Sequence, residues 1–350
     1  MSFVYVANNG GSNVSVIDTK VNRPISNITA GGLPFATILS PNGQYCYVLS
    51  VGTPGNVAVI DTKNHGVIAK VQVGSLLFIE FPTTPMAITH DGQLIYVANT
   101  NSNDITVIDT KDNRVIATVG MNDNPISIAI TPDDQYVYVL HSTSGSFASV
   151  NVIETKMHRV ISTIRTGVFA FNIKITPNGQ YAYLSDLGGD TVFVLDIKTH
   201  KVIAAVPVGE DPFSLAFTAD GQYVYVGNIN ENTVSVIETK YNQVISTIRV
   251  GASPLALKVT LDDQYVYVAN LDGNTVSVIE IKTNQVISTI DVGTFPFTLG
   301  ITADDRYVYV VNSQFSGSGG NTVSVIETKT NQVISTIGVG SMPVALAITP

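Results

Sequence analysis

The chain is built from short runs of apolar residues that recur at a nearly fixed spacing. In the segment QYVYVANLDGNTVSVIEI (264–281), residues 265–268 are β-branched and aromatic, 270–274 are turn residues, and 276–279 form a second apolar run. The same predicted hairpin occurs eight times, and the tyrosine of its first strand is Tyr5, Tyr47, Tyr96, Tyr138, Tyr183, Tyr225, Tyr267 and Tyr309. A repeat of about 42 residues with four short strands is typical of a β-propeller blade.

Each repeat predicts four antiparallel strands, ordered from the inside of the ring to the outside. In one repeat these are an apolar strand over 254–260, the tyrosine strand, the Val-Ser-Val-Ile strand, and a last strand over 286–290. One blade cannot bury both of its faces, so only a closed ring of blades forms a core. The sequence therefore predicts an all-β fold, an eight-bladed propeller that forms a single domain over 1–350.

The connections between strands vary in length at one end of the ring only. Seven residues always separate the end of strand one from the tyrosine, as from Ser40 to Tyr47, and eight separate equivalent isoleucines of strands three and four, as from Ile17 to Ile25. The longer connections, at 51–56, 74–82, 142–149 and 313–321, belong to the opposite face, which we call the top. Loops that vary on a rigid scaffold commonly carry function, which favours a site at the top.

The two ends of the chain predict how the ring closes. The last apolar strand, 343–349, has no following strands of its own. We expect the strands at 3–7, 14–17 and 25–28 to complete that blade, which leaves the blade with four strands like the others.

The repeated Tyr-Val-Ala-Asn strand, followed by Asn-Thr-Val-Ser-Val-Ile-Glu-Thr-Lys, carries a family resemblance. These motifs resemble the YVTN β-propeller repeats of surface-layer and lactonase-like proteins, over the whole chain. The resemblance implies the fold, and it implies no single function because the family has many roles. Many relatives have seven blades where this chain has eight, and no motif matches the site residues of lactonases or quinoproteins.

Composition narrows the classes of partner. The net charge of −9 argues against nucleic acid, and no run of eighteen apolar residues predicts a membrane span. Met1 leads directly into a strand without a signal peptide, so we expect a cytoplasmic protein, or an extracellular or surface protein if a leader was removed. The single cysteine, Cys46, stands where most repeats have Val and predicts a small buried apolar residue.

The histidines do not predict a metal centre. Four of the five fall in bottom turns of different blades, at His65, His90, His158 and His200. Ligands in different blades are too dispersed for a zinc or copper site. We therefore expect no metal and no cofactor.

Phenylalanine gathers at the top. Ten of the 13 are expected in top loops or at the top of strand one: Phe35, Phe78, Phe81, Phe147, Phe169, Phe171, Phe213, Phe295, Phe297 and Phe315. Together with Met342 they predict an aromatic-lined depression over the central channel that binds an apolar ligand. The alternative, strongest for Phe35, Phe171, Phe213 and Phe297, is that they fill space between blades.

Polar residues that break the repeat are the candidates for chemistry. The tyrosine strand ends in Asn or Ser except at His141 and Asp186, which could act as a general base and its carboxylate, or could be drift. Lys174 and Lys258 interrupt strand one, where other repeats have small or apolar residues. They predict either ion pairs or an anion site in the channel. Arg165 and Arg249, nine residues before them, and the rim acids Glu80, Glu210 and Asp211 are further candidates.

Three functions remain open from these patterns. The first is small-molecule binding at the top, with or without a cofactor-independent isomerase-, lyase- or cyclase-type step that uses His141, Asp186, Lys174, Lys258 and Glu80. The second is a non-enzymatic scaffold whose top loops dock a protein or a cell-surface partner. The third is a lactonase-like hydrolase, for which the sequence supplies no cluster of polar or metal-binding groups.

Overall fold

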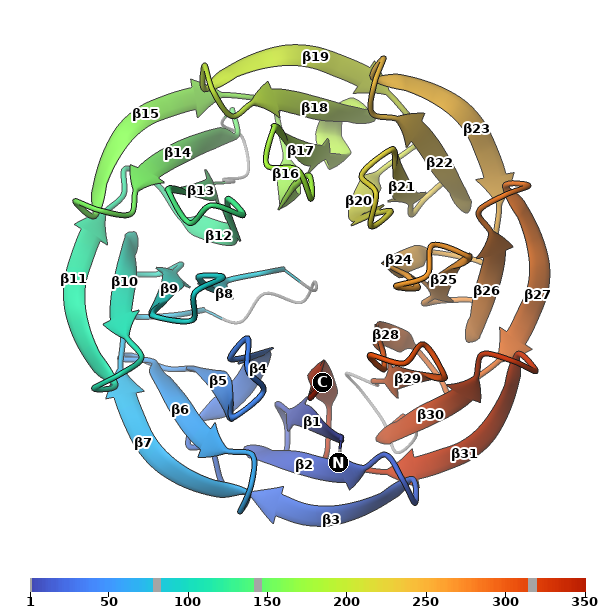
Figure 1. The fold of residues 1–350 in the computed structure, drawn as a ribbon, viewed down its shortest axis with the longest axis horizontal. Coiled ribbons are helices and arrows are strands. Elements are labelled where there is room, and N and C mark those ends of the chain that lie inside the picture. Colours follow the sequence, from blue (N-terminus) through green and yellow to red (C-terminus); the bar gives the residue numbers. More distant parts are fainter. Residues whose placement is uncertain (1, 78–82, 142–146, 314–319) are drawn as a thin grey trace.

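The computed structural model describes residues 2–77, 83–141, 147–313 and 320–350. Eight four-stranded antiparallel sheets stand side by side around a ring, as the repeat predicted (Figure 1). Each sheet is one blade, with its first strand innermost and its fourth strand at the outer rim. A single turn of 3-10 helix, η1 (Leu187–Gly189), is the one helical element in the described part of the chain.

The strands of the eight blades follow one another regularly along the chain. The first three blades are β4 (Leu33–Leu39), β5 (Tyr45–Val51), β6 (Asn56–Asp61) and β7 (Gly66–Gln72); β8 (Met86–Ile88), β9 (Leu94–Asn99), β10 (Asp104–Asp109) and β11 (Arg114–Gly120); and β12 (Pro125–Ile130), β13 (Tyr136–His141), β14 (Ser149–Glu154) and β15 (Arg159–Arg165). The next two are β16 (Ala170–Ile175), β17 (Tyr181–Asp186), β18 (Thr191–Asp196) and β19 (Lys201–Pro207); and β20 (Pro212–Phe217), β21 (Tyr223–Asn228), β22 (Thr233–Glu238) and β23 (Gln243–Arg249). Then come β24 (Pro254–Val259), β25 (Tyr265–Asn270), β26 (Thr275–Glu280) and β27 (Gln285–Asp291); and β28 (Pro296–Ile301), β29 (Tyr307–Asn312), β30 (Thr322–Glu327) and β31 (Gln332–Gly338).

The eighth blade is made from both ends of the chain, as expected. Its strand order is β32 (Pro343–Ile348), β1 (Phe3–Asn8), β2 (Asn13–Asp18) and β3 (Arg23–Ile28). β1 pairs with β32 from Val4 and Ile348 to Asn8 and Pro343. At the bottom, the amide of Phe3 donates to Thr349 Oγ1 over 2.7 Å, and the Thr349 amide donates to the Phe3 carbonyl over 2.9 Å.

The observed strands are one or two residues longer than the apolar runs suggested at several ends. β25 continues to Asn270, and β27 runs over Gln285–Asp291 rather than 286–290. The reason is that turn-forming residues still pair across the hairpin, as Asn270 does with Thr275. A polar side chain therefore shows where the buried face ends, whereas the strand itself continues for one or two more residues.

The second and third strands of every blade are the buried core. All eight marker tyrosines are 1% exposed or less, and the neighbouring valines and isoleucines are equally buried. Cys46 is fully buried and free, as expected, and burial raises the pKa of its thiol. Strands buried on both faces explain why only 13% of the residues are charged.

Tyrosine hydroxyls fasten neighbouring blades together. At seven of the eight junctions, a described contact joins the hydroxyl to a residue of the next blade's bottom turn between strands three and four. The acceptors are Asn22, Asn242, Asn284 and Asn331, and at three junctions His65, His158 and His200 are the partners. All seven partners have φ between +49° and +58°, a left-handed conformation that Asn and His tolerate better than most residues. We call these contacts the tyrosine latches.

The fourth strand of every blade contains a β-bulge. The register between strands three and four shifts by one residue at the same place in each blade, as between Val152 and Ile153 of β14. Opposite that shift, Ile161 of β15 is left without a partner, and it is 40% exposed. Its seven equivalents are Ile25, Ile68, Ile116, Ile203, Ile245, Ile287 and Ile334, all of them exposed.

No helix in the part of the chain that the structure describes is long and apolar enough to cross a membrane.

Candidate functional site: the central channel

Eight large apolar side chains encircle the upper part of the channel. Each is the residue after the first proline of the innermost strand, or after Ala170 in one blade. They are Phe35, Met86, Ile126, Phe171, Phe213, Leu255, Phe297 and Val344, all at most 9% exposed and all in one hydrophobic cluster. We call this ring the collar. Its burial agrees with the space-filling alternative for the four phenylalanines.

A cavity of about 200 Å³ lies in the channel beside and below the collar. Phe35, Met86, Phe297 and Val344 line its apolar part, and Lys258 lines it from β24. Thr37, Thr84 and Thr298 add hydroxyl groups to its wall. The cavity therefore has an apolar end and a polar end with one amine.

Lys258 and Lys174 lie at the same level of the channel. Lys258 pairs with Tyr267 and Lys174 with Tyr183, the marker tyrosines of their blades. Neither forms an ion pair with any residue that the structure describes. The described residues therefore give no support to the alternative that Lys174 and Lys258 form ion pairs. Partial removal from bulk water inside the channel lowers the pKa of both amines, although Lys174 is only half-buried and Lys258 is exposed to the channel. For Lys174 the charge of Lys258 lowers the pKa further.

Lys174 lines a second pocket, of about 380 Å³, which opens widely toward the bottom of the ring. We call this pocket the lower cavity and the one beside the collar the upper cavity. The wall is mostly apolar and includes Ile128, Ile130, Ile173 and Ile175. His90 and Thr84 are polar residues of this wall, and Thr84 also lines the upper cavity.

His141 and Asp186 are both 1% exposed, and each is bound to a backbone segment of its own blade. His141 Nδ1 lies 3.0 Å from the Asp123 carbonyl, which makes Nδ1 the protonated ring nitrogen. Asp186 accepts the amides of Val168 and Phe169, the shortest over 2.7 Å. Among the described residues the structure gives no hydrogen bond or ion pair between the two side chains. Burial lowers the pKa of His141, so its imidazole is neutral at neutral pH.

The other sequence candidates are distributed over the top. Phe169 is half-buried and meets Phe171 edge-on, with ring centroids 4.9 Å apart, and Phe171 is 5.6 Å from Phe213. Phe295 is 37% exposed, and Met342 packs partly buried against the collar cluster. Phe78, Glu80, Phe81 and Phe315 lie outside the described residues.

The charged candidates lie away from the channel amines. Arg165 and Arg249 are exposed and end the outermost strands β15 and β23, whereas Lys174 and Lys258 are on innermost strands. Each arginine stands nine residues before its lysine in the sequence, and the separation of outer and inner strands keeps the two apart in the ring. Glu210 is exposed, and Asp211 accepts a hydrogen bond from the Asn230 side chain.

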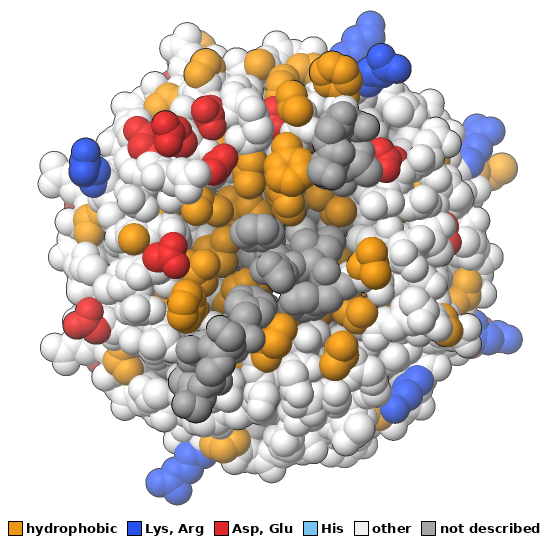
Figure 2. All heavy atoms as spheres, turned by 180° about the vertical axis from the view of Figure 1, so that it is seen from behind, with side chains coloured by type: hydrophobic (Ala, Val, Ile, Leu, Met, Phe, Trp, Pro, Cys, Tyr) orange, Lys and Arg blue, Asp and Glu red, His pale blue; other side chains and the backbone are white. Residues whose placement is uncertain are grey.

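Figure 2 shows the top face, with the undescribed segments in grey. Apolar side chains gather toward its centre, and acidic side chains lie mainly to one side. Exposed apolar residues of the top connections are Leu33, Leu77, Phe147, Val168 and Phe295.

Sequence reasoning missed the residues that make up the upper cavity apart from its phenylalanines and Lys258. Thr37 is the most informative of them, because its buried hydroxyl has no hydrogen-bond partner among the described residues. The sequence did contain a signal for them. Because the spacing between strand one and the marker tyrosine is constant, counting back from each tyrosine identifies the strand-one residues that lie at the same level of the channel.

Two family models match parts of the chain. The model described as lactonase, 7-bladed beta-propeller, matches residues 170–332, just under half of the chain. The model described as the cytochrome D1 heme domain matches residues 85–212. No curated protein sequence matches the chain.

Solved structures share the fold at low sequence identity. A chain of "Kuenenia stuttgartiensis Hydrazine Synthase" is 21% identical, with a TM-score of 0.65 over 79% of this chain and 91% of that chain. The dihydro-heme d1 dehydrogenase NirN in complex with DHE is 17% identical, with a TM-score of 0.78 over 99% and 74%. A functionally unknown protein from Desulfotomaculum acetoxidans is 18% identical, with a TM-score of 0.64 over 82% and 94%. These likenesses show a propeller fold.

The described residues do not fit a haem in the upper cavity. Of the residues that line it, Met86 alone belongs to the types that ligate haem iron. A cavity of about 200 Å³ is close in size to one that holds a single benzene ring. In the described part of the chain, no three His, Cys, Asp or Glu residues gather as a metal site.

Proposed function

We propose that this protein binds a small apolar or aromatic molecule with an anionic end in the upper cavity of the channel. The observation that carries the proposal is the pairing of the collar with Lys258 in one cavity of about 200 Å³. An apolar cavity of about 150 Å³ holds benzene, so a ligand with one ring or a short branched chain suits this one. A carboxylate on that ligand would neutralise Lys258.

The comparisons support a small-molecule role in general terms. One matching family model is that of a lactonase, and one similar structure is a dehydrogenase in complex with DHE. The resemblance to YVTN repeats and the lactonase-like hydrolase stay predictions. In this proposal His141 and Asp186 hold backbone segments, and a proton-transfer role for them stays a prediction as well.

The test compares benzoate with neutral toluene by ligand-observed NMR and by native mass spectrometry. Lys258→Ala should weaken benzoate binding at least tenfold, because the amine that binds the carboxylate is gone, and should leave toluene binding unchanged. The variant should fold, because several other blades carry Ala at this position. Phe297→Ala should alter the binding of both. Leu255→Ala is the matched control, since Leu255 is an equally buried collar residue that does not line the cavity. Binding of benzoate that survives Lys258→Ala unchanged contradicts the proposal.

A second candidate is a docking surface for a protein partner. It is favoured by the exposed apolar residues of the top face, above all Phe147, which is 72% exposed. Contiguous apolar surface commonly marks interaction sites. Failure of both probes to bind, together with self-association that Phe147→Ser abolishes, would favour this candidate over ligand binding.

A further inference from the structure

Lys174 occupies a position that the rest of the ring fills with small or apolar residues. Eight residues of the innermost strands stand opposite the eight marker tyrosines at one level of the channel. They are Ile38, Ala87, Ala129, Lys174, Ala216, Lys258, Gly300 and Ala347. Two amines therefore face the channel at this level, from β16 and β24, which Figure 1 shows on one side of the ring with β20 between them.

Among the described residues that line the lower cavity around Lys174, none is a carboxylate. The lower cavity is walled by isoleucines, Ala129, Pro132 and Pro177, with Thr84, Thr176 and His90 as its polar residues. The ring of His90 is bound to Asp134, 2.9 Å away, so that carboxylate is already engaged. Lys258, on the innermost strand two blades away, carries a positive charge that acts on the amine of Lys174.

These surroundings change the state of the amine. Removal from bulk water disfavours the ammonium form, and the positive charge of Lys258 disfavours it again. Together they lower the pKa of Lys174 to about 7, so about half of the amine is unprotonated at neutral pH. An unprotonated lysine in an apolar cavity beside another cation is an arrangement suited to nucleophilic attack on carbonyl groups.

We propose that Lys174 is a nucleophilic amine that forms an imine with a small apolar aldehyde or ketone in the lower cavity, and that Lys258 is its positioning residue. The Nζ lone pair attacks the carbonyl carbon, and a carbon–nitrogen bond forms. The nitrogen loses its two protons as the carbonyl oxygen gains them and leaves as water. The reaction needs no oxidant, reductant or metal, and it is reversible.

This inference can be tested separately from ligand binding in the upper cavity, although both involve Lys258. Its nucleophile is Lys174 in the lower cavity, whereas the proposed function rests on Lys258, the collar and the upper cavity. One can fail while the other stands.

The test is reductive trapping of the intact protein with butanone and cyanoborohydride near pH 7, followed by peptide mapping. An exposed lysine has a pKa near 10.4, so its unprotonated fraction is about a thousandfold smaller than that of Lys174. Allowing for the lower basicity of Lys174, we expect it to be labelled roughly a hundredfold faster than the exposed Lys329. Equal labelling of the two overturns the proposal, as does a folded protein in which Lys174 stays unlabelled.

Variants then assign the roles. Lys174→Ala should remove the fast label, and it should fold, since Ala is the residue at this level in four blades. Lys258→Ala should keep the label but move its pH profile upward, because the neighbouring charge is gone. Lys329→Ala is the control and should leave the fast label unchanged. A pH profile that does not move in Lys258→Ala contradicts the positioning role.

Discussion

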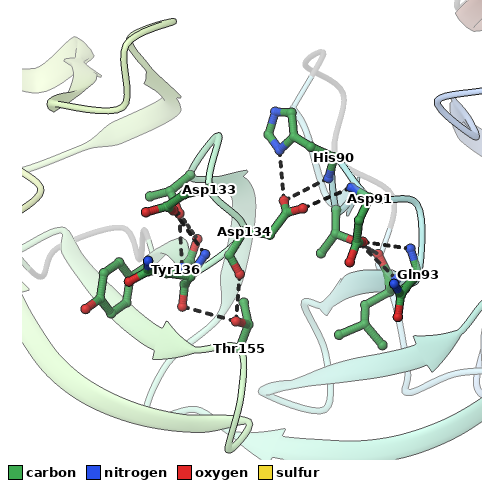
Figure 3. A network of polar contacts seen from close by, with 11 residues as sticks. His90, Asp91, Gln93, Asp133, Asp134, Tyr136 and Thr155 are labelled. Atoms are coloured by element: carbon green, nitrogen blue, oxygen red, sulfur yellow. Dashed lines mark hydrogen bonds and ion pairs between the residues drawn. The ribbon is translucent and has the colours of Figure 1, made fainter.

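Asp134 binds the blade before its own through His90. Its Oδ1 accepts the backbone amide of His90 over 2.8 Å and contacts the ring Nδ1 at 2.9 Å, while its Oδ2 accepts the amide of Asp91 over 2.9 Å (Figure 3). Asp263 and Asp305 accept the two equivalent amides at two other junctions. All three aspartates have positive φ, between +54° and +57°.

At other junctions the two facing turns pack without these hydrogen bonds. Where the preceding turn carries a proline, which has no amide to donate, the facing residue is glycine. The pairs are Pro41 with Gly92, Pro132 with Gly179, Pro177 with Gly221, and Pro350 with Gly43. A Cβ on Gly92 would lie 3.1 Å from the Pro41 ring, so glycine leaves the space that the proline needs. At the junctions named here, aspartate occurs where the first residue of the facing turn can donate its amide, and glycine occurs where that residue is proline.

This complementarity predicts the outcome of a double-mutant cycle. Asp134→Gly leaves two solvent-exposed amides without their protein acceptor and should destabilise the protein by about 0.5–1.5 kcal/mol. Adding His90→Pro removes one of those amides and recreates the proline–glycine pair, so the double variant should regain part of the loss. We expect a coupling of about 1 kcal/mol from urea denaturation. Additive single effects would contradict the idea.

The tyrosine latches predict sensitivity to acid. Burial lowers the pKa of His65, His158 and His200 below 6.5, so the folded protein binds fewer protons than the unfolded chain. Stability should therefore be unaffected by these groups above pH 6.5 and should fall as the pH drops below it. A protonated ring also cannot accept the tyrosine hydroxyl at Nδ1.

The matched variant for the latches replaces all three histidines with Asn. Asn already accepts the tyrosine hydroxyl at four junctions, so the substitution keeps the bond and removes the titration. The melting temperature of the triple variant should fall less between pH 7 and about pH 5 than that of the wild type. His141 remains in both proteins, so some slope should persist. Identical slopes would refute the assignment.

Lys174 predicts a gain in stability on the alkaline side. Its folded pKa of about 7 lies below the ordinary lysine value, so the unfolded chain takes up a proton that the folded protein does not. Stability should rise from about pH 7 to about pH 10, because over this range the unfolded lysine is protonated and the folded amine is not. Lys174→Ala should stabilise the protein at pH 7 by roughly 2 kcal/mol, allowing for solvent in the channel, and should flatten the rise. Thermal melts across this range, with Lys329→Ala as control, give the answer.

Asp186 separates a structural role from a catalytic one. Asp186→Asn keeps the side-chain volume but replaces one carboxylate oxygen with an NH2 group. That group is a donor and cannot accept the amides of Val168 and Phe169. We expect a loss of about 1–3 kcal/mol in unfolding free energy and unchanged benzoate binding at temperatures well below the melt. Lost binding in a folded variant would instead support the role in chemistry that the sequence suggested.

Sequence reasoning succeeded where the repeat itself carries the information. Eight tyrosine strands fix the blade count, and the unpaired strand at 343–349 fixes how the ring closes, because each blade has the same four pieces. The level of Lys174 and Lys258 was also readable, since both stand a constant distance from their marker tyrosines.

The placement of the candidate site residues depends on the direction of side chains and on the distance from the axis, which the repeat does not give. His141 and Asp186 end the second strands of neighbouring blades, yet each binds the backbone of the loop that leads into its own blade. Arg165 and Arg249 are close to the lysines in sequence but lie on outer strands. The pairing of Asp134 with His90 was present in the sequence, but it becomes visible only when one knows which turns face each other across a junction.

The unpaired isoleucines of the outer strands bear on how the protein behaves in concentrated solution. Each blade presents a free strand edge to solvent, and such an edge is a template on which a second copy could add its own strand. The bulge at Ile25, Ile161 and their equivalents breaks the even spacing of amides and carbonyls along that edge. A second molecule can therefore match only part of each strand, which makes the eight open edges poor templates for adding further copies.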